Sequence, residues 1–361
     1  MKSPNKELCS WKEPLQVAKE LTKEWGTEGL IWLDGDNSKL GKWITIGVDP
    51  IEQISCHGLP NNKDAKNPFQ ILRGLNKGHW TGWLSYEASA WLEPSNPWKE
   101  DQMSTLWIAS HDPILKFDLE KKQLWVEGYN RKRLEIIKNF ITNIPEEITS
   151  FDYSKNKEFS IEVPSWKWLT KKEEFSCQVK KVKELIREGD LFQANLSACC
   201  IAKLPASNCE IDLFQKLRIY SPAPFSGLVI GAGEAKSEAI ISASPERFLK
   251  VLTNGTVETR PIKGTRPRHI NSIKDVEIAI DLVCSPKDRA ENIMIVDLIR
   301  NDLGRVCCPG TIHVPQLAGL ESYKHVHHLT SVVKGTLRDN KTWVDLLEAS
   351  WPGGSISGTP K

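Results

Sequence analysis

The hydrophobic pattern divides the chain into two halves, which differ in how clearly turn and capping residues mark the ends of their elements. In the first half, short apolar runs between polar turns predict strands, followed by one helix. The expected strands cover 30–33, 43–47, 82–86 and 124–126, and the expected helix covers 132–142. Residues 152–168 are polar and contain Pro164, which predicts a connection between an N-terminal region, 1–155, and a C-terminal region, 156–361.

A helix and a strand are predicted at the start of the second half. Thr170 and Glu173 have the spacing of a capping box, apolar residues follow at helical intervals, and Gly189 ends the pattern. The next segment, 191–198, alternates like a strand. Its polar face carries Gln193, Asn195 and Ser197. Such a face either lines a site or is exposed to solvent, and for a single strand the second is commoner.

A hairpin is predicted over 242–260, because Asn254-Gly255 is a preferred dipeptide for a two-residue turn. If the same register continues, Glu246 lies opposite Lys263, at a Cβ separation of roughly 4.5–5.5 Å. The pattern therefore predicts a carboxyl and an amine in one small space. An ordinary cross-strand ion pair is the alternative interpretation.

Residues 261–265, Pro-Ile-Lys-Gly-Thr, carry the most informative candidate chemistry. Three arginines lie close to Lys263 in sequence: Arg260, Arg266 and Arg268. Neighbouring cations favour the neutral, nucleophilic form of a lysine, and guanidinium groups suit a carboxylate-bearing substrate. Gly264 would let a ligand approach the backbone closely. The alternative is a basic hairpin end that faces water.

Two further helices are predicted, opened by Ser272 and by Ser285-Pro286. Glu291 lies on the second, where a lone glutamate is either a solvated charge or one of two acids at a metal site. Among the histidines at 325, 327 and 328, strand alternation places the last on its own face, which is poor geometry for a three-histidine metal site. We therefore interpret His328 as a substrate-binding or structurally paired histidine.

Composition excludes several classes of protein. The 361 residues are 40% hydrophobic and 26% charged, with a net charge of +2, so nucleic acid is not an expected partner. The nine cysteines include no C-x-x-C spacing, which argues against disulfide and zinc frameworks. The chain start lacks the apolar core of a signal peptide, and no apolar run reaches the ~20 residues of a membrane helix. We expect a cytoplasmic protein that contacts no membrane.

Six blocks in the second half resemble, in order, the anthranilate synthase component I family of chorismate-utilising enzymes. They cover 190–197, 244–248, 260–266, 288–304, 328–331 and 351–361. The first half is similar more loosely, through 31–34 and 41–47. The resemblance implies an α/β fold of the α+β type, a sandwich of two antiparallel β-sheets with helices outside.

Within that family, Pro-Ile-Lys-Gly-Thr resembles the aminodeoxychorismate synthase component I branch, whereas anthranilate synthases resemble Pro-Ile-Ala-Gly-Thr. The resemblance implies Lys263 as nucleophile, Glu246 as general acid and Glu291 as a Mg²⁺ ligand. Implied substrate contacts are Gly264, Thr265, His328, Gln193 and Asn195. Ammonia would come from a glutamine amidotransferase subunit and convert chorismate to 4-amino-4-deoxychorismate. Some relatives bind tryptophan, and the matching stretch here would involve Pro224, Phe225 and Ser226.

The family continues well past Lys361 and supplies a second magnesium-binding glutamate there, so we expect this chain to be catalytically impaired. Two alternatives stay open at this point. One is anthranilate synthase component I, and the other is a truncated, non-catalytic remnant that only binds the amidotransferase.

Overall fold

The computed structural model describes residues 3–95, 97–145, 165–205 and 209–361. Contacts group the chain into two compact units, each made of two stretches. The first comprises Met1–Val163 and Leu204–Pro245, and the second comprises Pro164–Lys203 and Glu246–Lys361. The functional boundary at 155/156 stays a prediction, and most of the connection expected over 152–168 lies outside the described residues.

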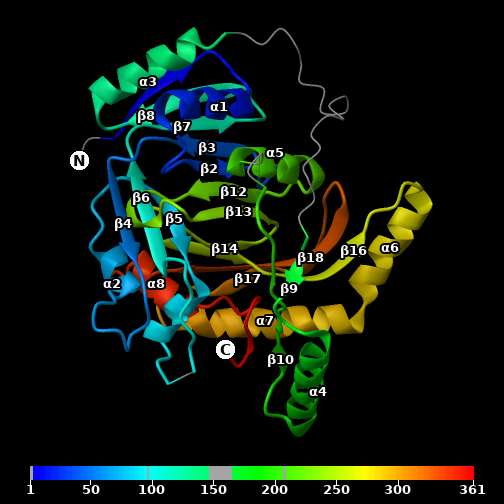
Figure 1. Cartoon of the computed structure of the whole chain (residues 1–361). Coiled ribbons are helices and arrows are strands. Elements are labelled where there is room, and N and C mark those ends of the chain that lie inside the picture. The colour runs from blue at the N-terminus through cyan, green and yellow to red at the C-terminus, as the bar shows by residue number, and fades with distance from the viewer. Residues whose placement is uncertain (1–2, 96, 146–164, 206–208) are drawn as a thin grey trace. The chain divides into compact units, whose positions relative to one another are not determined.

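The first unit is built on a seven-stranded antiparallel sheet of order β1-β8-β7-β3-β2-β12-β13, beside a three-stranded sheet of order β4-β6-β5. Helices α1, α3 and α5 share one apolar core with the larger sheet (Figure 1). The main elements are β1 (Asn5–Cys9), α1 (Pro14–Trp25), β2 (Ile31–Asp34), β3 (Trp43–Gly47), β4 (Glu52–Cys56), α2 (Pro68–Arg73), β5 (His79–Leu84), β6 (Leu106–His111), β7 (Ile114–Asp118), β8 (Gln123–Gly128), α3 (Arg131–Asn143), α5 (Glu210–Tyr220), β12 (Phe225–Ile230) and β13 (Ala239–Ser244).

The second unit is built on a five-stranded sheet in which the long strand β18 pairs with β15, β16 and β17. Helix α7 packs along β16, β17 and β18, and shares an apolar core with α8 (Figure 1). The elements are β9 (Lys167–Trp168), α4 (Lys172–Glu188), β10 (Gln193–Ala194), β11 (Cys200–Ile201), β14 (Arg247–Val251), β15 (Thr256–Arg260), β16 (Ile262–Pro267), α6 (Ser272–Cys284), α7 (Pro286–Gly304), β17 (His313–Ser322), β18 (Val326–Thr336), α8 (Trp343–Ser350) and β19 (Gly358–Thr359).

The expected fold class, a mixed α/β fold on antiparallel sheets, is confirmed. Several element ends are confirmed as well. Helix α4 ends at Gly189, whose φ of 89° lies in the left-handed region, and α7 begins after Ser285, whose side chain accepts from the Asp288 N–H. In the described part of the chain, none of the helices combines the length and the apolar composition that crossing a lipid bilayer requires.

Three local predictions are wrong. Lys171, not Thr170, is the N-cap of α4, because the Thr170 hydroxyl accepts from the Cys199 N–H at 3.1 Å instead. Asn271 rather than Ser272 caps α6. The strand expected over 191–198 is limited to β10, since two residues there pair with β19.

Candidate active site

Lys263 lies in β16, next to a β-bulge between Ile262 and Thr265 that interrupts pairing with β18. Gly264 sits in this bulge with a φ of 89°. A Cβ at that position would lie 2.9 Å from the Asp288 Cβ on α7. The glycine is therefore required by the bulge and by the close approach of the helix.

The hairpin register that predicted Glu246 opposite Lys263 is wrong. Strand β14 begins at Arg247, which pairs with Arg260, and the Leu252 N–H donates to the Thr256 carbonyl, so the turn has three residues rather than two. Strand β16 pairs with β18, not with β14. The loop before β14 nevertheless brings Glu246 within electrostatic reach of Lys263.

The Glu246 carboxyl is half-buried, and its surroundings change its proton affinity. Burial raises the pKa of Glu246, while the Ser355 side chain, the Lys263 charge and the Ile262 backbone N–H oppose that rise without cancelling it. A carboxyl with a raised pKa keeps its proton closer to neutral pH, as a general acid must.

One loop, between α8 and β19, joins the predicted residues. The Ser355 carbonyl accepts from Lys263 Nζ at 3.2 Å and from Asn195 Nδ2 at 2.7 Å. Gln193 pairs with Thr359 across β10 and β19. The sequence motif at 351–361 served only to establish a family resemblance, so Ser355 was missed as a site residue.

Several buried polar atoms around this loop have no regular hydrogen-bond partner among the described residues, and two of them belong to site residues: Gln193 Oε1 and Ser355 Oγ. The Ser355 side chain also lowers the pKa of Glu246, so the two groups lie close to one another. Buried polar atoms are rarely left unsatisfied, so both are available to a water molecule or a ligand.

His328 on β18 lies opposite Thr265 on β16, and their side chains form a hydrogen bond. The Thr265 hydroxyl and His328 Nδ1 are 2.9 Å apart. Burial lowers the pKa of His328, which keeps the ring neutral near pH 7. His327 contacts Asp275 on α6 instead, which confirms that the two histidines face different neighbours.

The three arginines near Lys263 do not supply uncompensated positive charge. Arg260 pairs with Glu321, and Arg266 pairs with Asp281 and Asp288. Arg268 forms a two-pronged contact with Asp275. The expectation that these arginines would act on the lysine or wait for a substrate carboxylate is therefore not supported, because acidic side chains already occupy them.

Glu291 lies on α7, with 36% of its side chain exposed and Lys287 Nζ at 3.9 Å. Among the described residues, no group of three or more His, Cys, Asp or Glu side chains is arranged to hold a metal ion. One exposed carboxylate does not make a complete magnesium site. The role of Glu291 as a ligand stays a prediction.

A model of the chorismate binding enzyme family matches residues 30–361. The chain belongs to this family. It is 36% identical over 290 residues to an anthranilate synthase component I-like protein of Synechocystis, covering 79% of this chain and 56% of that protein. It is 44% identical over 188 residues to aminodeoxychorismate synthase component 1 of Salmonella typhimurium, covering 52% of this chain and 40% of the relative.

A solved structure gives the same classification. Anthranilate synthase component I from Streptococcus pneumoniae superimposes with a TM-score of 0.71 at 26% identity, covering 90% of this chain and 76% of that one. The chain spans about half the length of these two relatives and about three quarters of the structural neighbour.

The stretch suggested for tryptophan binding lies in the first unit of the chain. Ser226 on β12 pairs with Asp34 on β2, so the end of this stretch lies beside β2. Asp34 is buried and accepts from Arg218 Nη2 at 3.2 Å and from Trp32 Nε1 at 3.2 Å. The Asp34 carboxylate is thus already engaged by the protein, and a tryptophan site at Pro224, Phe225 and Ser226 stays a prediction.

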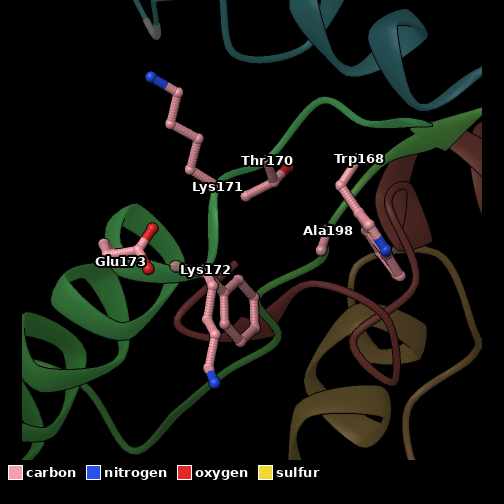
Figure 2. A pocket seen from close by; sticks show the side chains of 7 residues that line it. Trp168, Thr170, Lys171, Lys172, Glu173 and Ala198 are labelled. Carbon is pink, nitrogen blue, oxygen red and sulfur yellow. The ribbon is translucent and has the colours of Figure 1, made fainter.

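A separate open hollow of about 550 Å³ lies at the start of α4. Figure 2 shows the side chains of Trp168, Lys172 and Glu173 among those that line it. None of the predicted site residues lies there. The candidate active site is therefore the arrangement around Lys263, and not this hollow.

Proposed function

We propose that this chorismate binding enzyme acts as an aminodeoxychorismate synthase component I. It would replace the hydroxyl at ring carbon 4 of chorismate with an amino group. The observation that carries the proposal is the Lys263 amine, held by the Ser355 carbonyl at 3.2 Å, beside a Glu246 carboxyl whose pKa is raised by burial. The Pro-Ile-Lys-Gly-Thr block also resembles the aminodeoxychorismate synthase branch more than the anthranilate synthases.

The proposed reaction has two displacements. After losing its proton, the Lys263 amine attacks ring carbon 2, the two conjugated ring double bonds shift, and the bond from carbon 4 to oxygen breaks as Glu246 donates its proton, releasing water. Ammonia then adds at carbon 4, the two double bonds shift back, and the bond from carbon 2 to lysine breaks. A proton from the added ammonia returns to Glu246, so hydroxyl is exchanged for amine and both protein groups are restored.

We propose glutamine as the source of ammonia, through a partner amidotransferase, since one relative is named aminodeoxychorismate synthase component 1. Gly264, Thr265, His328, Gln193 and Asn195 are the proposed substrate contacts. Dependence on Mg²⁺ also stays a prediction, because Glu291 is a single exposed carboxylate. In the two proposed displacements, the groups that the protein contributes are the side chains of Lys263 and Glu246.

Anthranilate synthase component I is a second candidate, because the Streptococcus structure carries that name and the Synechocystis relative is named as a protein like it. The test supplies chorismate, Mg²⁺ and ammonium to the chain and identifies products by mass. We expect 4-amino-4-deoxychorismate, and a loss of about three orders of magnitude or more in Lys263→Ala, which should also lack any adduct with chorismate. Lys274→Ala, at an exposed lysine, is the matched control.

The other outcomes decide between the alternatives. Direct formation of anthranilate would favour the second candidate. An adduct that persists in Lys263→Ala would refute the nucleophile assignment. If wild type gives neither product, the proposal is overturned for this chain, and a non-catalytic binding protein is the better description.

A further inference from the structure

We propose that Ser355 is a positioning residue for the Lys263 amine and the Glu246 carboxyl, and that its loop is held by a buried ion pair between Lys361 and Asp302. The proposal rests on the proposed function for its kinetic consequence. Its geometric basis is independent of any substrate.

The Ser355 carbonyl is shared by two donors. Lys263 Nζ donates from 3.2 Å and Asn195 Nδ2 from 2.7 Å. A lysine that donates to a fixed acceptor loses much of its side-chain freedom, and the lone pair of an uncharged amine then points away from that acceptor. The carbonyl thus directs the nucleophile without consuming the electron pair needed for attack.

The loop that presents this carbonyl is tightly built. The Gly353 carbonyl accepts from the Ile356 N–H at 3.1 Å, the Ser357 N–H at 3.1 Å and the Ser357 hydroxyl at 2.9 Å. At Gly354, an added Cβ would lie 2.4 Å from a Leu298 methyl group on α7. The backbone around Ser355 is therefore fixed both internally and against α7.

Lys361 closes the loop from its far end. Its Nζ lies 2.6 Å from the Asp302 carboxylate on α7 and 2.7 Å from the Ser350 carbonyl at the end of α8. Asp302 is only 3% exposed. Because a buried charge without its partner is costly, this pair ties both ends of the segment 351–360 to the same helices.

The Ser355 hydroxyl has a second role. It is buried, has no regular hydrogen-bond partner, and faces the Glu246 carboxyl together with Lys263 from β16. Its removal would take away an influence that lowers the pKa of Glu246. Ser355→Ala should therefore move the basic limb of the kcat/KM against pH profile to higher pH, which a purely structural residue would not do.

The main test measures how fast an amine-reactive reagent labels Lys263 relative to exposed Lys274, by peptide mass spectrometry. The double variant Lys361→Met with Asp302→Asn removes the ion pair without leaving a lone buried charge. We expect labelling of Lys263 to rise at least threefold as its side chain is released, and kcat for amination to fall about tenfold with a smaller change in KM. Lys132→Met, at an exposed lysine, is the control and should match wild type.

Equal labelling of Lys263 in the double variant and wild type would overturn the proposal. If the double variant does not fold, Asn195→Ala removes the second donor from an exposed position and gives the same comparison. Labelling needs no chorismate, so a wild-type chain that fails to aminate would refute the proposed function alone. Full turnover and unchanged labelling in the variants would refute the positioning role alone.

Discussion

At the scale of single residues, the burial that suits Glu246 to act as a general acid also makes its ionised form lower the stability of the fold. Burial raises the pKa of this carboxyl, so the folded state binds its proton more tightly than the unfolded state. The free energy of unfolding should therefore fall as pH rises from the ordinary carboxyl pKa through the raised value. Glutamine keeps the shape of the side chain and carries no charge.

We therefore expect Glu246→Gln to abolish that pH slope and to leave stability at pH 7 equal or higher, while amination falls by about 10²- to 10⁴-fold. Urea unfolding and product formation measure the two effects. Glu258→Gln is the contrast, because Glu258 accepts from Arg247 at 2.8 Å and lies 3.4 Å from Lys334. It should lose about 1–2 kcal/mol of stability. Equal losses of stability in Glu246→Gln and Glu258→Gln would contradict this account.

At the scale of elements, the bulge in β16 depends on Gly264. Gly264 and Gly189 both have a φ of 89°, but a Cβ at Gly264 would contact α7 whereas one at Gly189 would meet open space. We expect Gly189→Ala to cost about 1 kcal/mol and Gly264→Ala about 2–3 kcal/mol or more, because the second adds a steric clash to the backbone strain. Urea unfolding of both variants tests the difference. Equal losses of unfolding free energy would show that α7 moves away without an energetic penalty.

The start of α6 depends on Asp275. Its carboxylate accepts from Arg268 Nη2 at 2.7 Å, from the His269 N–H at 2.8 Å and from His327 Nε2 at 3.1 Å. These contacts, led by Arg268, hold the pKa of Asp275 well below its usual value. A lowered carboxyl pKa contributes stability that is present above the usual pKa and is lost as pH falls through the lowered one.

Asp275→Asn should therefore unfold at a lower urea concentration than wild type at pH 7. The difference between the two urea midpoints should narrow as pH falls below about 4. Urea midpoints measured across that range test this. A gap that stays constant to the lowest pH would assign the effect to shape and not to charge. Asp297→Asn is the control, since its ion pair with Arg300 is exposed and should matter little at any pH.

Local signals predicted the helix ends well where one residue type decides the backbone, as at Gly189 and Ser285-Pro286. They failed where a distant partner decides. Alternation over 191–198 could not reveal that β19 would pair with only two residues. Ser355 contacts residues 92 and 160 positions away, which no spacing rule connects. The predicted register that would set Lys263 opposite Glu246 is wrong, and the charge of Lys263 nevertheless affects Glu246 through a different arrangement of loop and bulge.

At the scale of the whole chain, apolar side chains remain exposed on α6. Ile273, Val276 and Ile280 are 69%, 57% and 55% exposed, and α4 has no buried residue along its apolar face. Contiguous exposed apolar surface promotes association. The isolated chain should therefore bind hydrophobic dyes and self-associate as its concentration rises.

The double variant Ile273→Ser with Ile280→Ser should reduce both dye binding and self-association, with less than about 1 kcal/mol change in stability. Dye fluorescence and light scattering measure this. Ile295→Ser, at a fully buried position on α7, is the contrast and should cost several kcal/mol. Unchanged light scattering in the double variant would show that self-association does not depend on the apolar face of α6.

Trp351 gives the proposed site an optical reporter. Its ring meets Phe248 edge-on, with centroids 5.8 Å apart, and it begins the loop that carries Ser355. The chain has fourteen tryptophans, so its total emission is uninformative, but subtracting the spectrum of Trp351→Phe isolates this one indole. A ligand that settles between Lys263 and Glu246 should perturb that difference spectrum, which allows binding to be titrated without turnover.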